Sequence, residues 1–307
     1  MQDVLVLGGG PAGMSAALYC ARAGLSVAVL EKAIVGGQMA LAERIENYPA
    51  ARQDGISLSL AMQQQAESFG ASFLFTEIAS ADLTAQPKVL RSVKEVFEAP
   101  CVILATGAAP MRLGLPNEAQ YVGRGLSYCA TCDGRFFREK CVAVVGGGNS
   151  AVSEALYLSD LGAQVHLLHR RNELRAEKTL QKQLFRSPVI FHPICTVQAL
   201  SGKEKLQSII TETNGKRDEL AVDGLFVAIG RKPESELFRE SLCTDDRGYL
   251  LVPEDTKTAI PGVFAAGDVR QKPLRQIVTA VSDGAVAAHQ ALEFLRHKAQ
   301  FGGISRV

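Results

Sequence analysis

Two glycine-rich turns of the same type occur in this chain, 138 residues apart, and each lies between an apolar strand and a helix. The first, GGGPAG, covers residues 8–13, and the second, GGGNSA, covers residues 146–151. In a βαβ unit such glycines let the backbone bend tightly and approach a pyrophosphate at the helix N-terminus. The pattern therefore predicts an α/β protein with two Rossmann-like nucleotide-binding domains.

The composition is that of a globular protein without a strong charge. The chain has 307 residues, 47% of them apolar, and a net charge of +1, with Lys and Arg spread along it. This length allows about two domains, and the weak charge argues against nucleic acid or an acidic membrane surface as a partner. No apolar run approaches the roughly 18 residues of a membrane helix, and the chain opens without a secretion signal. We expect no membrane partner and a cytoplasmic location.

The apolar pattern also predicts the regular elements around both turns. The expected strands are 4–7, 26–30, 101–105, 141–145, 164–168, 220–228 and 263–266, and the expected helices are 12–23, 57–69, 150–161 and 279–296.

The first turn carries a full set of nucleotide-binding features. Glu31 ends the second strand, 18 residues after Gly13, where a carboxylate can accept hydrogen bonds from a ribose 2′-hydroxyl. This suits an adenosine without a 2′-phosphate, and both FAD and NAD satisfy it. The candidate residues are Gly8, Gly10, Pro11, Ala12, Gly13 and Glu31.

The second turn has cations where the first has its acid. His169, Arg170 and Arg171 follow the second strand of this unit, and Arg175 comes four residues later. Arginine binds phosphate oxygens in a bidentate manner, whereas a carboxylate repels them. The site is therefore predicted to prefer NADPH to NADH; a solvated basic helix start is the alternative. Its candidate residues are Gly146, Gly148, Asn149, Ser150, His169, Arg170, Arg171 and Arg175.

A single CxxC pair, Cys129 and Cys132, lies between the two turns. Zinc would need a second pair, and His166 and His169, three apart on a strand, should point to opposite faces, so we expect no metal. Two buried thiols without chemistry are a further alternative. A CxxC pair is typically redox-active, because one thiol has a lowered pKa and its thiolate attacks a partner disulfide. Asp133 follows directly and can move the proton that this chemistry requires.

Further segments resemble those that line a flavin in pyridine-nucleotide disulfide oxidoreductases. They are Gly36-Gly37-Gln38, Asn47-Tyr48-Pro49, Ala105-Thr106-Gly107, Ala266-Gly267-Asp268, and Arg275-Gln276 at the expected start of the last helix. With CATCDG at 129–134 and HRR at 169–171, they make nearly the whole chain closely similar to the low-molecular-weight, bacterial-type thioredoxin reductases. The resemblance adds as expected FAD-binding residues Gly37, Gln38, Asn47, Thr106, Gly107, Asp268, Arg275 and Gln276.

This resemblance implies a homodimeric flavoprotein that passes electrons from NADPH through FAD to its own disulfide and then to thioredoxin. Cys132 would be the flavin-proximal thiol, Cys129 the interchange thiol and Asp133 the acid–base residue. An NADPH-binding domain carrying the CxxC, 114–244, would be inserted into an FAD-binding domain formed by 1–113 and 245–307. One domain would rotate on the other about crossings near 112–117 and 241–247.

The chain departs from the family pattern at one position, and two alternative functions remain open. Relatives often read AVEEA in the helix after the second turn, where this chain has Ser153 before Glu154, and this puts an acidic contact near the nicotinamide ribose in doubt. The dithiol could instead serve another small dithiol protein, glutaredoxin-like or peroxidase-linked. The chain could also be a flavin redox sensor that does not turn over.

Overall fold

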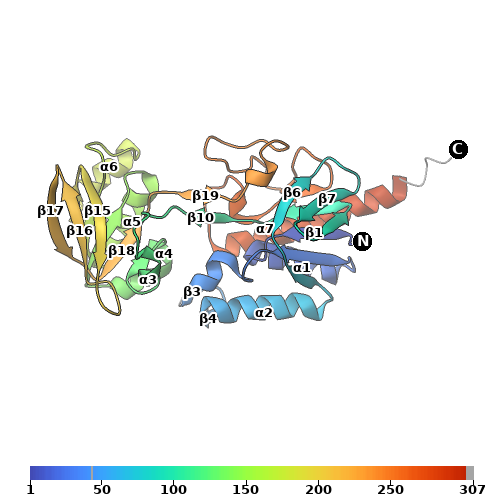
Figure 1. Cartoon of the computed structure of the whole chain (residues 1–307), viewed down its shortest axis with the longest axis horizontal. Helices are drawn as coiled ribbons and strands as arrows, with labels where there is room; N and C mark the ends of the chain where they lie inside the picture. The colour runs from blue at the N-terminus through green and yellow to red at the C-terminus, as the bar shows by residue number, and fades with distance from the viewer. Residues whose placement is uncertain (43, 302–307) are drawn as a thin grey trace. The chain divides into compact units, whose positions relative to one another are not determined.

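Each glycine-rich turn follows the central strand of a parallel sheet of its own (Figure 1). The computed structural model describes residues 1–42 and 44–301; the last residues of the predicted third segment, 302–307, lie outside the described part. The chain divides into unit 1, Met1–Ala109 with Lys232–Val307, and unit 2, Pro110–Arg231. Unit 2 is thus one continuous segment between the two parts of unit 1.

Unit 1 is built on five parallel strands in the order β20-β9-β1-β2-β5. Successive residues of a strand point to opposite faces, so β1 contributes to two cores. Val4 and Val6 join the core formed with α1 and α7, whereas Leu5 and Leu7 join the core on the other face. The elements are β1 (Val4–Leu7), α1 (Pro11–Arg22), β2 (Val27–Glu31), η1 (Gly37–Leu41), β3 (Ile45–Tyr48), β4 (Ala51–Gln53), α2 (Gly55–Ser68), β5 (Ser72–Phe75), β6 (Ile78–Asp82), β7 (Lys88–Ser92), β8 (Val96–Ala99), β9 (Cys101–Leu104), η3 (Glu236–Phe238), β20 (Val263–Ala265), η4 (Gly267–Val269) and α7 (Ile277–Phe301).

Helices α1 and α7 approach each other closely because small residues separate them. Ala16 of α1 and Ala287 of α7 are fully buried, and a Cβ on Gly284 would collide with the Ala12 carbonyl. The other face of the sheet is covered by the antiparallel sheet β6-β7-β8 and by residues such as Phe238.

Helix α2 begins at Gly55, two residues before the predicted start. Asp54 caps it: its carboxylate accepts the Ser57 N–H at 2.8 Å and the Ser57 hydroxyl at 2.6 Å. An N-cap carboxylate satisfies a backbone donor that the helix itself leaves unpaired.

Unit 2 repeats this plan with five parallel strands in the order β11-β18-β12-β13-β14. Val142 and Val144 of β12 join the core formed with α5, whereas Ala143 and Val145 join the core beneath the antiparallel sheet β15-β16-β17. The elements are α3 (Glu118–Tyr121), β11 (Leu126–Ser127), α4 (Ala130–Asp133), η2 (Gly134–Phe137), β12 (Cys141–Val145), α5 (Asn149–Asp160), β13 (Gln164–Leu168), α6 (Lys178–Leu184), β14 (Ile190–His192), β15 (Cys195–Ser201), β16 (Ser208–Thr213), β17 (Lys216–Ala221) and β18 (Gly224–Val227).

The sequence repeat is also a structural repeat. Both α1 and α5 have 12 residues, and they start at equivalent positions of the two turns. The predicted α/β fold with two Rossmann-like units is confirmed.

The predicted strand 220–228 is wrong, because it combines parts of two strands from different sheets. β17 ends at Ala221 in the antiparallel sheet, and β18 starts at Gly224 in the parallel sheet. The chain changes sheets at Asp223, whose carboxylate accepts the Cys141 N–H at 3.1 Å.

Both crossings between the units differ from the expected residues. The first lies after Ala109 and the second before Lys232, where β10 (Ala108–Pro110) pairs with β19 (Arg231–Pro233). The second crossing comes before 241–247 because Phe238 and Leu242 are already buried in the core of unit 1.

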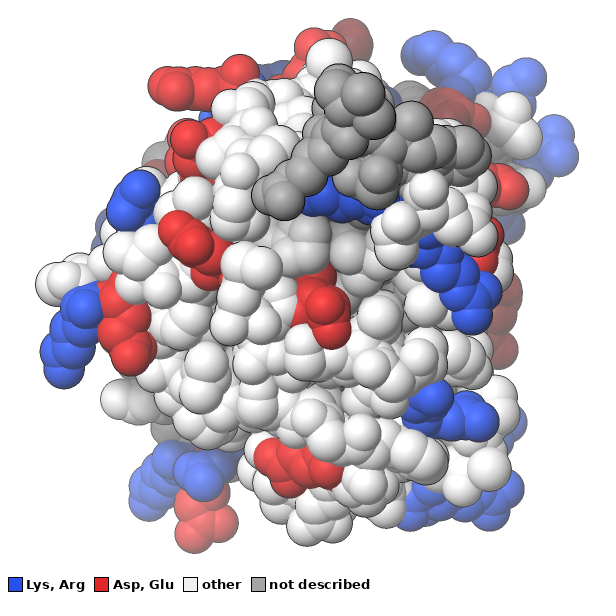
Figure 2. All heavy atoms as spheres, turned by 90° about the vertical axis from the view of Figure 1, so that its right-hand side faces the viewer, with Lys and Arg blue, Asp and Glu red and all other residues white. Residues whose placement is uncertain are grey.

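The described helices include none that is long and apolar enough to span a membrane. The face drawn in Figure 2 shows acidic and basic side chains interspersed among uncharged surface, without a continuous field of one sign.

Candidate active site

The first turn admits only glycine at two of its positions. Gly8 has a φ of 107°, and a Cβ there would collide with the Ala105 carbonyl. A Cβ on Gly13 would collide with the Gly8 carbonyl, because α1 packs directly on the turn. Gly10 has open space at its Cβ position, and α1, which starts with Pro11 and Ala12, has no side-chain cap. The backbone at this helix start is therefore accessible to a pyrophosphate.

Glu31 is buried beside this turn at the end of β2. Its two carboxylate oxygens accept the Gly9 N–H at 2.7 Å and the Ala33 N–H at 2.9 Å. These bonds fix its orientation, and each oxygen keeps a further lone pair. The position fits the predicted contact with a ribose hydroxyl.

Two flavin-type segments lie at the same end of the sheet as the first turn, the carboxyl end of its strands. The reason is that β9 lies beside β1, β20 lies beside β9, and all three strands are parallel. Thr106 and Gly107 come after β9, and the Thr106 hydroxyl donates to the Glu234 carbonyl at 2.6 Å. Asp268 lies in η4, after β20. Ligands of such sheets bind at the carboxyl ends of the strands, so unit 1 brings these predicted residues together at its ligand edge.

A buried charge cluster holds the Gly267–Asp268 turn. Asp283 of α7 accepts the Gly267 N–H at 2.9 Å and forms ion pairs with Arg270 at 3.1 Å and Lys272 at 2.8 Å. Asp283 was not predicted from the sequence, where its one signal is an acid within an otherwise apolar stretch of the last helix.

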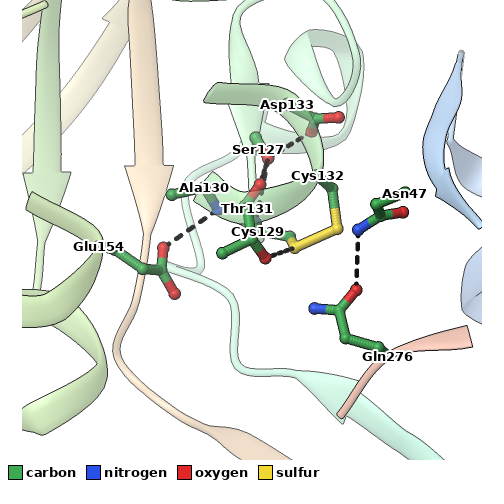
Figure 3. Close-up of a disulfide and its surroundings, with 9 residues drawn as sticks. All are labelled: Asn47, Ser127, Cys129, Ala130, Thr131, Cys132, Asp133, Glu154 and Gln276. Carbon is green, nitrogen blue, oxygen red and sulfur yellow. Dashed lines mark hydrogen bonds between the residues drawn. A yellow bond between two sulfur atoms is a disulfide. The ribbon is translucent and has the colours of Figure 1, made fainter. Parts of the chain in front are cut away.

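The remaining flavin-type residues lie in three short segments of unit 1. Gly37 begins η1, with its Cβ position 3.7 Å from the Cα of Gly10, and Gln38 follows it. Asn47 donates through Nδ2 to Oε1 of Gln276 at 2.9 Å (Figure 3).

Arg275 does not open the last helix, as the sequence analysis expected. The helix begins at Ile277. The Arg275 guanidinium instead stacks on Tyr249, 4.1 Å from the ring centroid, and donates to the Arg270 carbonyl at 3.3 Å.

The second turn repeats the geometry of the first. Gly146 has a φ of 152°, and a Cβ there would collide with the Ala228 carbonyl, while Gly148 has open space at its Cβ position. Asn149 and Ser150 begin α5, which has no side-chain cap. Asn149 donates to the Glu177 carboxylate at 2.9 Å and accepts the Glu177 N–H at 2.8 Å.

His169 occupies in unit 2 the place that Glu31 occupies in unit 1. Its buried ring lies against Gly147, where a Cβ would collide with it, and its Nε2 has no hydrogen-bond partner among the described residues. Burial lowers the pKa of His169, and the field of Arg175, Arg171 and Arg170 lowers it further. The three arginines are exposed, so unit 2 gathers the predicted cations beside its nucleotide turn.

The CxxC pair forms a disulfide around the start of α4, with the two Cα atoms 5.3 Å apart (Figure 3). The Cys129 carbonyl accepts the N–H groups of Cys132 and Asp133 at 3.2 and 3.1 Å. The Ser127 hydroxyl donates to the Asp133 carboxylate at 2.5 Å and accepts the Cys129 N–H at 3.0 Å. Ser127 thus connects the predicted acid–base residue to the first cysteine, a role that its sequence position alone does not indicate.

Two further carboxylates lie near the dithiol and were not predicted. Glu154 of α5 accepts the Ala130 N–H at 3.3 Å. Glu118 accepts the Tyr128 hydroxyl at 2.7 Å, and burial together with this bond raises the pKa of Tyr128. Within residues 1–42 and 44–301, His, Cys, Asp and Glu form no group that could hold a metal ion.

Comparison with known proteins places the chain in a family. The sequence profile of the pyridine nucleotide-disulphide oxidoreductases matches residues 2–284. Thioredoxin reductase from Peptoclostridium acidaminophilum is 41% identical over 304 residues, which are 95% of this chain and 96% of that protein. The enzyme of the same name from Bacillus subtilis (strain 168) is 40% identical over 298 residues, which are 95% and 94% of the two chains.

The fold comparison agrees. The crystal structure of thioredoxin reductase from Streptococcus pyogenes MGAS5005 superposes with a TM-score of 0.91 at 40% identity, covering 97% of this chain and 99% of that one. The predicted resemblance is confirmed, and the chain belongs to the pyridine nucleotide-disulphide oxidoreductase family.

Proposed function

We propose that this chain is an NADPH-dependent thioredoxin-disulfide reductase that uses FAD. The observation that carries the proposal is the Cys129–Cys132 disulfide, formed in the same unit as an arginine-flanked nucleotide turn. The relatives named thioredoxin reductase, 40–41% identical over 95% of the chain, support thioredoxin as the substrate.

Each unit takes one nucleotide in this proposal. Unit 1 binds FAD, with its pyrophosphate at the Gly8–Gly13 turn, a ribose on Glu31 and the ribityl chain near Asp268. Unit 2 binds NADPH, with its pyrophosphate at Gly146–Ala151 and its 2′-phosphate on the exposed arginines, which suit phosphate better than a carboxylate would. Bound FAD supplies a centre that accepts a hydride from NADPH and passes an electron pair to a disulfide.

The chain's own residues then carry the disulfide chemistry. The Cys129–Cys132 disulfide accepts two electrons and one proton and becomes a thiol and a thiolate. Cys129 attacks one sulfur of the thioredoxin disulfide and forms a mixed disulfide, and Cys132 then attacks Cys129 and restores the internal bond. Asp133, held by the Ser127 hydroxyl, gives the proton that the leaving thioredoxin thiolate takes up.

We also propose that the protein is a cytoplasmic homodimer. Unit 1 leaves large apolar side chains exposed, including Ile56 and Leu60, which lie on one stripe of α2 and are 52% and 50% exposed; a second copy would bury them. The other five cysteines are unpaired, three of them buried, which suits a reducing compartment. Sedimentation of the yellow holoenzyme tests the dimer, and a monomer at micromolar concentration would refute it.

The activity is tested with Cys129→Ser, and Cys243→Ser serves as the matched control because Cys243 is an exposed free thiol. We expect NADPH to bleach the flavin in both variants, and only the control to reduce thioredoxin. Retained thioredoxin reduction by Cys129→Ser would overturn the proposal. Turnover with a glutaredoxin-like protein but not with thioredoxin would favour another dithiol substrate, and flavin reduction without any disulfide turnover would indicate a sensor.

A further inference from the structure

A half-buried carboxyl group, that of Glu154, contacts the dithiol segment from α5. Glu154 projects from α5, and its Oε2 accepts the N–H of Ala130, the residue directly after Cys129, at 3.3 Å (Figure 3). Ala130 is fully buried, in the same core as Ala151 and Ala155 of α5. Helix α5 therefore bonds to the backbone between the two sulfurs.

The surroundings of Glu154 offer it little compensation for a negative charge. Burial raises the pKa of Glu154 to about 7, although the Ala130 N–H and the positive charge of Arg231 each act in the opposite direction. Helix α5 packs against α4, η2, β12, β13 and α6. The titratable groups on these elements are Asp133 of α4, Arg135 of η2, Cys141 of β12, His166 of β13, and Lys178 and Lys182 of α6. Of the charges on described residues, only Arg231 contributes to the shift.

We propose that Glu154 is a positioning residue that takes up a proton when the dithiol is reduced and releases it when the disulfide forms again. The inference rests on the proposed function, because it requires Cys129 and Cys132 to be the redox pair. Reduction of the disulfide by two electrons places a negative charge on one sulfur and a proton on the other. The Glu154 carboxylate is bonded to the backbone N–H of Ala130, the residue after Cys129. Its negative charge disfavours a second negative charge on the dithiol, and binding a second proton at Glu154 removes this repulsion.

The step balances with the hydride of NADPH, which supplies two electrons and one proton, and one further proton from solvent. The sulfur–sulfur bond breaks, one proton goes to a thiol, and the other goes to the Glu154 carboxylate instead of to the thiolate. The thiolate therefore stays available for attack on the partner disulfide. When the disulfide forms again, both protons are released.

Glu154→Gln removes the titratable proton but keeps the hydrogen bond, because the amide oxygen still accepts the Ala130 N–H. Glu154→Asp restores a titratable group, and Glu204→Gln is the control for loss of a carboxylate at an exposed position of the same unit. The holoenzymes are equilibrated with dithiothreitol at a series of pH values around about 7, and the fraction of reduced dithiol is counted by alkylation and mass measurement.

Each proton taken up on reduction changes the equilibrium constant about tenfold per pH unit. Dithiothreitol releases two protons when it is oxidised, because its thiols are protonated near pH 7. The wild type and Glu204→Gln take up two protons, so their equilibrium constants with dithiothreitol should hardly change with pH. Glu154→Gln takes up one proton, so its constant should rise about threefold to tenfold per pH unit, and Glu154→Asp should lie between the two. Equal slopes in wild type and Glu154→Gln would overturn the inference. If NADPH leaves Cys129 and Cys132 closed to alkylation in the wild type itself, the proposed function fails instead.

Discussion

Replacing Arg170 and Arg171 by glutamine should weaken NADPH binding far more than NADH binding. Both side chains are exposed, and the ion pairs among the described residues engage neither of them, so their charge is available to a ligand. An arginine–phosphate bond is charge-assisted, but exposure and salt reduce its contribution to about 0.5 to 1.5 kcal/mol. Two such bonds amount to about 1 to 3 kcal/mol, which is roughly a 5- to 150-fold rise in KM for NADPH.

Steady-state kinetics with both nucleotides measure this effect, at low and at physiological ionic strength. The rise should shrink as salt increases, because the Debye length falls to about 8 Å at 0.15 M. Arg186→Gln, a change at another exposed arginine of unit 2, should leave both KM values unchanged. An equal rise in KM for NADPH and NADH in the double variant would refute the 2′-phosphate assignment.

Three further outcomes test the geometry of the two units. Gly13→Ala should destabilise the fold by about 1 to 3 kcal/mol, because its Cβ meets the Gly8 carbonyl. Gly10→Ala, whose Cβ meets nothing, should leave the unfolding of the flavin-free protein unchanged and weaken FAD retention; equal unfolding midpoints for the two variants would contradict this. Asp283→Asn should lower the free energy of unfolding by about 2 kcal/mol or more, because it leaves Arg270 and Lys272 without their carboxylate. It should also speed FAD loss on dilution, and a melting temperature equal to that of the wild type would argue against the cluster. Burial raises the pKa of Glu154 from 4.5 to about 7, so the folded state binds this proton more tightly and the free energy of unfolding falls as pH rises between these values. Glu154→Gln should remove that fall. In urea titrations its free energy of unfolding should exceed that of the wild type by about 2 kcal/mol above pH 7, and the difference should disappear below about pH 4.5. A difference that does not depend on pH would show that the proton is not its cause.

The sequence predicts the parallel sheets well because their signals are local. Glycine turns, buried apolar runs and helix stops all act over a few residues, and the predicted bounds of strands 141–145 and 164–168 agree with the structure. The antiparallel sheets β6-β7-β8 and β15-β16-β17 were not predicted, because their half-exposed strands lack a continuous apolar run. The error at 220–228 has a different cause. The apolar end of β17 and the strand β18 belong to different sheets, but only Val222 and Asp223 separate them, so the sequence shows one run.

Residues that support the site were harder to find than residues in motifs. Ser127, Glu154 and Asp283 act through hydrogen bonds or ion pairs to residues of other segments. No spacing rule connects Asp283 with Gly267, or Glu154 with Ala130. Their roles follow from packing of α7 and α5 against the turns, which only a structure provides.

The two nucleotide turns differ at the residue at the end of the second strand, Glu31 or His169, and in the arginines that follow His169. In unit 1 a carboxylate at the end of β2 binds the turn through the Gly9 N–H, and it leaves no place for a second anion. In unit 2 the ring of His169 lies against Gly147, and burial and the arginines both disfavour its charged form. A carboxylate at 169 would pair with those arginines itself, whereas a neutral ring leaves their charge to the ligand. Because the two turns share the same backbone geometry, we expect the choice between a bare and a phosphorylated ribose to depend on this position together with Arg170, Arg171 and Arg175.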